Sequence, residues 1–190
     1  MKSIKTAALS AALMLASLAA HAGTYQFSYS FDPVNTGDGN PVSITGTFSG
    51  DQVGSLVNNI ANVQVFLNGT AFQGPLFAEG WNASAQDWDS AVAPVVSLSD
   101  VTQNNFIFAD THVSVDPNAS NYFWFAGGQT LAVNFNQTDI NSNPLSGYET
   151  AVNGKWSVSA TAAVPEPESV ALALMGLGLL GAAAIRRRAC

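Results

Sequence analysis

Basic residues and cysteine are nearly absent from the middle of this 190-residue sequence. Its one cysteine is Cys190, the last residue, so neither an intramolecular disulfide nor a cysteine-based zinc site can form. Between residues 23 and 164 the only basic residue is Lys155, set against 11 acidic residues, which gives this segment a net charge of −10. A surface so poor in cations cannot neutralise phosphates, and nucleic-acid binding is therefore excluded.

Histidine is equally scarce, because the same segment contains only His112, at the start of a predicted strand. A Ser-His-Asp triad would have to use this residue, and the Gly-x-Ser-x-Gly sequence of a nucleophile elbow is absent. A metal centre built on several histidines is excluded as well, because the segment contains only one histidine. We expect His112 to be an ordinary solvated side chain and the protein to be non-enzymatic.

The first 22 residues have the three parts of a secretory signal peptide. A lysine-containing start precedes the apolar residues 6–20, and Ala20 and Ala22 stand at the positions that signal peptidase reads. We predict cleavage between Ala22 and Gly23 and export of the remaining chain.

Residues 164–190 predict a second targeting segment. It comprises Val164, Pro165, Glu166 and Pro167, the uncharged residues 169–185, and then Arg186, Arg187 and Arg188. As a helix with a rise of ~1.5 Å per residue, the uncharged stretch is about 25 Å long, enough for a short transmembrane span. The arginines would remain in the cytoplasm under the positive-inside rule.

A Pro-Glu-Pro motif at 165–167, an apolar helix and an arginine cluster, in this order, strongly resemble the PEP-CTERM sorting signal. The same segment is also catalogued as the "ice-binding protein C-terminal domain", a label for the tail that gives the body no ice-binding activity. The resemblance implies a Gram-negative bacterium that makes exopolysaccharide, and processing near the motif by exosortase, a membrane-embedded thiol transpeptidase. It implies a precursor anchored in the inner membrane and then a place on the cell surface or in the extracellular matrix.

Residues 23–163 have the pattern of β-strands. Every second residue between 24 and 31 is aromatic, which is typical of a strand buried on one face. Asn68-Gly69 favours a tight type I′ hairpin turn, and Gly46 indicates a bulge. About ten short strands separated by Asn, Asp, Gly and Pro predict one all-β domain, an antiparallel β-sandwich or jelly roll.

This body resembles, in four short stretches, a group of exported PEP-CTERM proteins of unknown activity. The stretches are 27–31, 43–50, 65–69 and 105–110. The resemblance implies a shared architecture and supplies no catalytic residue.

Residues 78–93 depart from the strand pattern, because Trp81 and Trp88 are spaced as on a helix. A helix or a structured loop would fit this segment. Loops on a rigid sandwich commonly carry binding residues, so these two tryptophans are the candidates for stacking on sugar rings. Packing of the same side chains in a core is the alternative.

Carboxylates in the predicted loops are candidate calcium ligands, because this cation prefers oxygen donors. They are Asp32 and Asp38 in the first loop and Asp110 and Asp116 in a later one. Aspartate is also a default turn residue, so turn formation is the alternative. We expect no other cofactor.

Three functions follow from these observations. The leading hypothesis is a non-enzymatic surface or matrix protein, structural or adhesive in an exopolysaccharide biofilm. Its partners would be signal peptidase, exosortase, exopolysaccharide or other envelope glycans, and the membrane through the C-terminal helix. A carbohydrate-binding module that uses the two tryptophans is the second hypothesis. A glycosidase or polysaccharide lyase that uses Asp87, Asp89 or Glu149 is the third, with solvated surface acids as its alternative.

Overall fold

The computed structural model describes residues 22–126, 131–138 and 144–161. The predicted transmembrane helix (169–185), the sorting segment that contains it, and all but the last residue of the predicted signal peptide lie outside these ranges. Among the described residues, no helix is both long enough and apolar enough to cross a membrane. The described part is therefore the body between the two predicted targeting segments.

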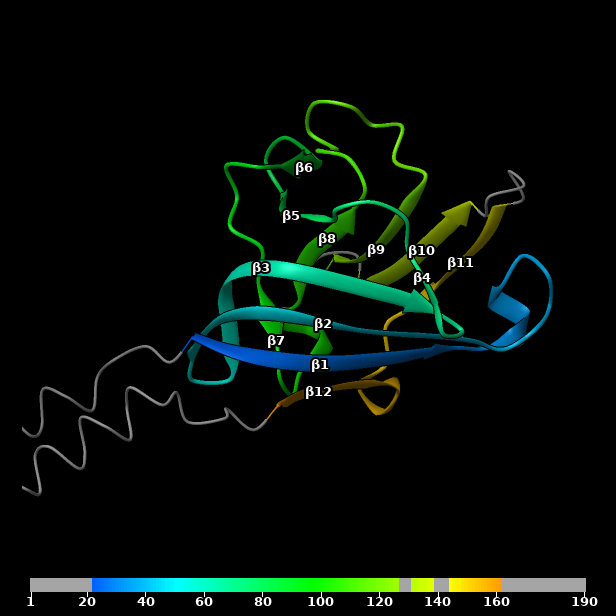
Figure 1. The fold of residues 1–190 in the computed structure, drawn as a ribbon, viewed down its shortest axis with the longest axis horizontal. Coiled ribbons are helices and arrows are strands. Elements are labelled where there is room, and N and C mark those ends of the chain that lie inside the picture. The colour runs from blue at the N-terminus through cyan, green and yellow to red at the C-terminus, as the bar shows by residue number, and fades with distance from the viewer. Residues whose placement is uncertain (1–21, 127–130, 139–143, 162–190) are drawn as a thin grey trace, which may run out of the picture.

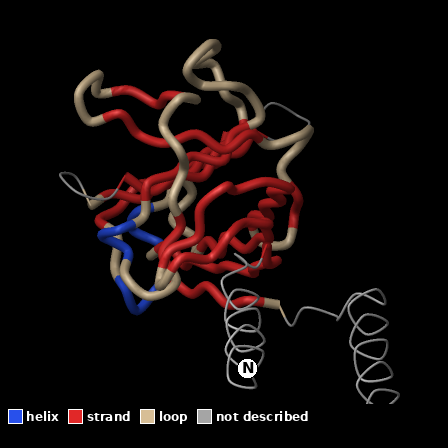
Figure 2. The backbone as a smooth tube through the Cα atoms, turned by 90° about the vertical axis from the view of Figure 1, so that its left-hand side faces the viewer, coloured by secondary structure: helices blue, strands red, loops and turns tan. Residues whose placement is uncertain are grey.

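Twelve strands form two six-stranded antiparallel sheets, which confirms the predicted all-β domain (Figure 1). The first sheet has the order β12-β1-β2-β3-β4, with β7 also paired to β3: β12 Trp156–Ala160, β1 Ala22–Phe31, β2 Val42–Val53, β3 Leu56–Leu67, β4 Thr70–Ala71 and β7 Val96–Ser97. The second has the order β11-β10-β9-β8-β5-β6: β11 Pro144–Thr150, β10 Ala132–Thr138, β9 Asn121–Ala126, β8 Asn105–Ala109, β5 Phe77–Asn82 and β6 Asp87–Asp89. Short 3-10 helices are η2 Pro33–Asn35, η3 Val101–Gln103 and η4 Asn153–Lys155, and strands make up most of the body (Figure 2).

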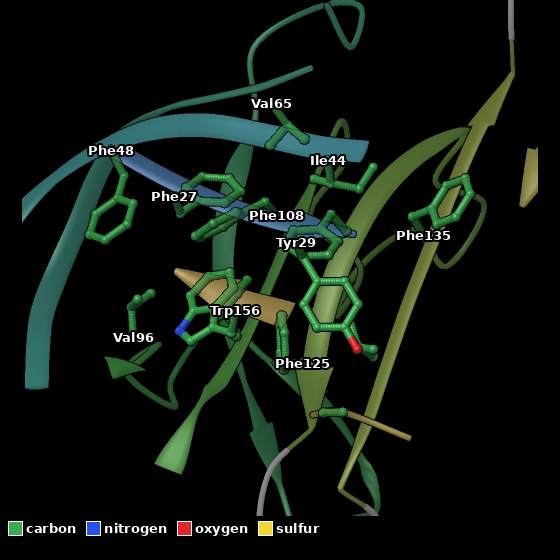
Figure 3. Close-up of a cluster of buried hydrophobic side chains, with 14 of the residues drawn as sticks. Phe27, Tyr29, Ile44, Phe48, Val65, Val96, Phe108, Phe125, Phe135 and Trp156 are labelled. Carbon is green, nitrogen blue, oxygen red and sulfur yellow. The ribbon is translucent and has the colours of Figure 1, made fainter. Parts of the chain in front are cut away.

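An aromatic core lies between the two sheets (Figure 3). The alternation in β1 points its aromatic side chains inward, and Phe27 is only 3% exposed. The Phe27 ring stacks on Phe123 of the second sheet at 5.8 Å, and Trp156 lies 4.8 Å from Phe125. The remaining fully buried rings include Tyr25, Tyr29, Phe48, Phe106, Phe108 and Phe135. Burial of these large side chains is the main source of stability for the body.

Hairpins lie in the first half of the body, and the one predicted at Asn68-Gly69 is confirmed. β1 pairs with β2 over ten residue pairs, from Ala22 with Asp51 to Phe31 with Val42. Asn68 and Gly69 connect β3 to β4, both with positive φ (48° and 84°), as a type I′ turn requires.

Residues 78–93 do not form a helix. They contribute β5 and β6, and the register places Trp81 directly opposite Trp88. The seven-residue spacing therefore comes from a hairpin: residues 83–86 form its loop, Asn82 pairs with Asp87, and Trp81 pairs with Trp88. Pairing of β5 with β8 outweighs the local helical pattern, which Gly80 already weakened.

The predicted bulge at Gly46 is wrong. Gly46 pairs in register with Phe27 and Val65, and the irregular register between β2 and β3 comes later, between Thr47 and Asp51. A side chain at Gly46 would collide with the Phe27 ring and with the backbone oxygen of Gln64. Glycine is therefore needed here because the Phe27 ring passes close to its backbone on the way into the core. The pairing of Gly46 with both neighbouring strands is kept.

We expect Gly46→Ala to lower the free energy of unfolding by about 1–3 kcal/mol or more, because the added methyl group meets backbone that cannot move away. Chemical denaturation of the purified protein measures the change. Gly154→Ala is the matched control, since a methyl group there would meet nothing within 4 Å. Equal stability of the two variants would contradict this account of Gly46.

Candidate functional site

A row of aromatic side chains crosses the outer face of the second sheet. Trp81 and Trp88 meet edge to face at 5.3 Å, Trp88 lies 5.8 Å from Trp124, and Trp124 lies 6.2 Å from Tyr148. The row thus runs from β6 at one edge of the sheet to β11 at the other. Tyr148 at its end is 54% exposed, and Trp88 near its start is 9% exposed.

The two predicted sugar-binding tryptophans lie on strands, not on a loop. Trp88 belongs to a small hydrophobic cluster with Ile107, Ala109 and Ala126, outside the main core. Trp81 packs against this cluster and is half-buried. Of the pair, Trp81 presents the more accessible ring, and the more buried Trp88 packs against it edge to face.

A second group of interacting side chains surrounds the buried carboxylate of Glu149. Tyr29 donates to its Oε1 at 2.6 Å, Lys155 donates to the same oxygen at 2.7 Å, and Asn35 donates to Oε2 at 2.8 Å. Lys155 also donates to Asp32 at 2.7 Å. Because Tyr29 comes from the first sheet and Glu149 from the second, this network ties the two layers together at one end.

The network changes the proton affinity of its members. Burial opposes ionisation of Glu149, but hydrogen bonds from Lys155, Tyr29 and Asn35 outweigh it and hold the Glu149 pKa below its ordinary value. Burial raises the pKa of the Tyr29 hydroxyl, and the Glu149 carboxylate raises it further. Tyr29 therefore remains a proton donor, and Glu149 an acceptor.

A third group centres on Glu79, which is 1% exposed. Nδ1 of His112 lies 3.0 Å from its Oε1, and the backbone and hydroxyl of Ser114 donate to the two carboxylate oxygens, each at 3.1 Å. The ring of His112 also lies 3.9 Å from that of Phe77. Since Ser114 bonds to the carboxylate and not to the histidine, these three side chains lack the nucleophile-to-base contact of a catalytic triad.

His112 is accessible to solvent, as the sequence predicts, but it also has a buried partner. Its side chain is 51% exposed, but one ring nitrogen contacts a buried carboxylate. It lies in a turn after β8, where the sequence predicts a strand start. The Glu79 partner is 33 residues away, and no local pattern points to it.

The candidate calcium ligands each bond to nearby protein groups. Asp38 accepts from the backbone and side chain of Asn40, and Asp116 accepts in the same way from Asn118, so both side chains form turns. These hydrogen bonds hold the pKa of each carboxyl below its ordinary value. Asp110 accepts from Asn121, and Asp32 pairs with Lys155. Within the described ranges no three His, Cys, Asp or Glu residues are grouped as a metal site.

The three candidate hydrolytic carboxylates are not brought together. Asp87 and Asp89 lie on β6, and Glu149 lies on β11, at the opposite edge of the same sheet. Five strand spacings of ~4.8 Å separate these edges by about 24 Å. Paired carboxylates in glycosidases stand only about 5–9.5 Å apart, so Glu149 cannot pair with either aspartate.

Residues 163–188 match a family model described as the PEP-CTERM protein-sorting motif. This protein carries a PEP-CTERM sorting motif. The match spans the predicted motif residues from Val164 to Pro167 and the arginines up to Arg188. It supports an exported protein that exosortase sorts to the cell surface through a membrane-anchored precursor. No curated protein and no solved structure matches the chain.

The signal-peptide cleavage point predicted between Ala22 and Gly23 falls within β1 and stays a prediction. β1 begins at Ala22, and Gly23 already pairs with Gly50. Gly23, the predicted new N-terminus, therefore lies within a paired strand of the body.

We expect Trp88→Ala to lower the free energy of unfolding by about 3–5 kcal/mol, because it leaves a cavity in the small hydrophobic cluster with Ile107, Ala109 and Ala126. Trp81→Ala should cost less, since this side chain is only half-buried. Denaturant titration of both variants measures the difference. A larger loss in Trp81→Ala would contradict the assignment of Trp88 as the more buried ring of the pair.

We expect the protein to lose stability as the pH falls below about 4.5, the ordinary pKa of Glu149. A carboxyl whose pKa is lowered by folding stabilises the protein above its unfolded pKa, and the contribution disappears as the pH falls through the folded pKa. Melting temperatures between pH 7 and pH 3 measure this. Glu149→Gln should melt lower at pH 7 and lose less on acidification, whereas the exposed Asp87→Asn should follow the wild type. An unchanged pH profile in Glu149→Gln would contradict the assignment.

Proposed function

We propose that this PEP-CTERM protein is a non-enzymatic component of the cell surface or extracellular matrix, with a structural or adhesive role in the exopolysaccharide biofilm of a Gram-negative bacterium. One observation carries the proposal: a sorting motif at residues 163–188 follows an all-β body whose last described strand is β12. The motif directs the body to the envelope, and the body is the part of the protein that would interact with the surrounding matrix.

The engagement of the body's glutamates supports a non-enzymatic role. Glu79 and Glu149 are both buried, and each accepts several hydrogen bonds from neighbouring protein groups. A general acid or base must reach a substrate proton, and these carboxylates are turned toward Ser114, Tyr29 and Lys155 instead. They stabilise the body.

Charge limits the kind of glycan that fits. Residues 23–164 carry a net charge of −10, so the body repels polyanions at moderate ionic strength. An uncharged polysaccharide avoids this repulsion. Adhesion within the matrix would therefore involve neutral sugar units.

A carbohydrate-binding module that uses Trp81 and Trp88 is the second candidate function. The edge-to-face pair at 5.3 Å, with Trp81 half-buried, offers one partly accessible ring on a rigid hairpin. Aromatic rings of this kind stack on the apolar faces of sugars. Glycan-array binding that is lost in Trp81→Ala, in a variant that still folds, would favour this function.

A glycosidase or polysaccharide lyase is the third candidate, and it makes a separate prediction. Release of reducing ends or unsaturated products from purified exopolysaccharide would support it, provided that Asp87→Asn or Asp89→Asn abolishes the release. Absence of any release in the wild type would favour the non-enzymatic proposal.

We expect replacement of both motif prolines (Pro165→Ala with Pro167→Ala) to prevent correct sorting in the native host. The wild type should be recovered from the cell surface or matrix with both ends shortened, as intact-mass analysis would detect. The variant should keep its C-terminal segment and stay with the inner-membrane fraction.

Val115→Ala, an exposed change in the body, is the matched control and should sort normally. A wild-type protein of full length in the cytoplasm would contradict the proposed function. Wild-type levels of surface protein in the double-proline variant would contradict the role of the motif.

A further inference from the structure

We propose that the outer face of β9, β10 and β11 binds an uncharged polysaccharide in a shallow groove. The inference rests on the proposed function and names the site through which the protein would hold the matrix. The groove has a volume of about 520 Å³ and is lined by Tyr122, Asn134, Asn136, Ser146, Tyr148 and the loop at Val34–Gly37. It lies at the Tyr148 end of the aromatic row, away from Trp81 and Trp88.

The strand pattern builds the floor of the groove. Val133 and Phe135 of β10 point into the core, so Asn134 and Asn136 between them point outward. Asn134 stands opposite Trp124 on one side and Tyr148 on the other. The outward amide group of Asn134 is therefore flanked by an aromatic ring on each neighbouring strand.

The residues opposite Asn136 form the rest of the floor of the groove. Asn136 stands opposite Tyr122 on β9 and Ser146 on β11. Its amide nitrogen donates to the backbone oxygen of Ser120 at 2.7 Å, which fixes the side chain on the sheet. The result is a preformed surface about 10 Å wide, the span of three strands, which is wide enough for a pyranose ring.

The loop that contains η2 forms the wall of the groove and is held firmly against β11. Gly37 donates to the backbone oxygen of Ser146 at 2.8 Å, and Thr36 forms a β-bridge with Gly147. A side chain at Gly147 would approach the Asn35 backbone oxygen to 2.9 Å, so glycine lets the loop come this close. Binding would then order little new backbone, which favours affinity.

The chemistry of the lining matches a neutral sugar. Tyr148 is 54% exposed and offers a ring to the apolar face of a sugar, while amide and hydroxyl groups meet its hydroxyls. None of the described residues that line the groove carries a charge. Around it, a body with a net charge of −10 disfavours anionic polymers.

Affinity electrophoresis of the mature protein from its native host tests the inference. The probes are three uncharged polysaccharides, dextran, laminarin and hydroxyethyl cellulose, and one anionic polysaccharide, alginate. We expect retarded migration in at least one uncharged gel and none in alginate. Tyr148→Ala and Asn134→Ala should each weaken this retardation about tenfold or more, as for a residue at the centre of a contact.

The variants also contain the controls. Tyr148→Phe keeps the ring and should still bind, and Trp81→Ala and Val115→Ala lie outside the groove and should bind like the wild type. Melting temperatures close to that of the wild type would show that Tyr148→Ala, a change at an exposed position, keeps its fold.

Several outcomes would overturn the inference. These are retention in none of the uncharged gels, retention in alginate alone, binding that survives both Tyr148→Ala and Asn134→Ala, and binding that only Trp81→Ala removes. Surface fractionation of the same strains separates this failure from that of the proposed function. A protein that reaches the surface but binds no uncharged probe refutes the groove alone, whereas failure to reach the surface refutes the proposed function.

Discussion

Contact between aromatic rings of the two sheets is the interaction on which the rest of the structure depends. The body has no cysteine, so no disulfide can join the two sheets, and its one lysine forms ion pairs with Asp32 and Glu149 at one end of the sandwich. Phe27 stacks on Phe123 with the ring planes 2° apart, and Phe31 meets Phe135 edge to face at 4.7 Å. Each of these rings occupies an alternate position of its strand, so the core also determines which residues face solvent.

The outward-facing side chains of the two sheets differ in kind. On the first sheet the outward residues of β1 are Thr24, Gln26, Ser28 and Ser30, which need only be polar. On the second sheet the outward positions of β9 carry Tyr122 and Trp124, although the main core has no need of them. Large rings on a solvent face cost solubility unless they pack or bind something. Trp88 and Trp124 pack against each other and against the small hydrophobic cluster, whereas Tyr148 remains exposed beside the outward-facing amide groups.

Features with a local cause could be predicted from the sequence. The alternation in β1 requires only its own side chains, and the Asn68-Gly69 turn requires only two residues that accept positive φ. The sorting motif is likewise a continuous segment, and the prediction from Val164 to Arg188 agrees with the matched residues. These features do not depend on how distant strands pair.

Features that depend on distant partners could not be predicted. Tyr29 and Glu149 are separated by 120 positions, and Glu79 and His112 by 33, so neither pair leaves a signature in the local pattern. The helical spacing of Trp81 and Trp88 was misleading because a hairpin with a four-residue loop produces the same interval. The role of Gly46 also depends on a distant residue, because its backbone conformation is ordinary and its neighbour across the sheet is the large Phe27 ring. In each case a partner that is distant in the sequence, not the local pattern, determines the role.

The pairing of β1 with β12 places both ends of the body at one pole. Tyr25 stands opposite Ala160, and the backbone nitrogen of Thr161 donates to the oxygen of Thr24 at 2.8 Å. The loop with η2 follows the far end of β1, ten residues and about 33 Å along the strand. The length of the first sheet therefore separates the η2 loop from the two ends of the body. A body attached through its C-terminal end would hold the η2 loop at the tip farthest from the attachment point. A label fused to the mature N-terminus would report on the attached pole, and a label in the η2 loop would report on the pole that meets the surroundings.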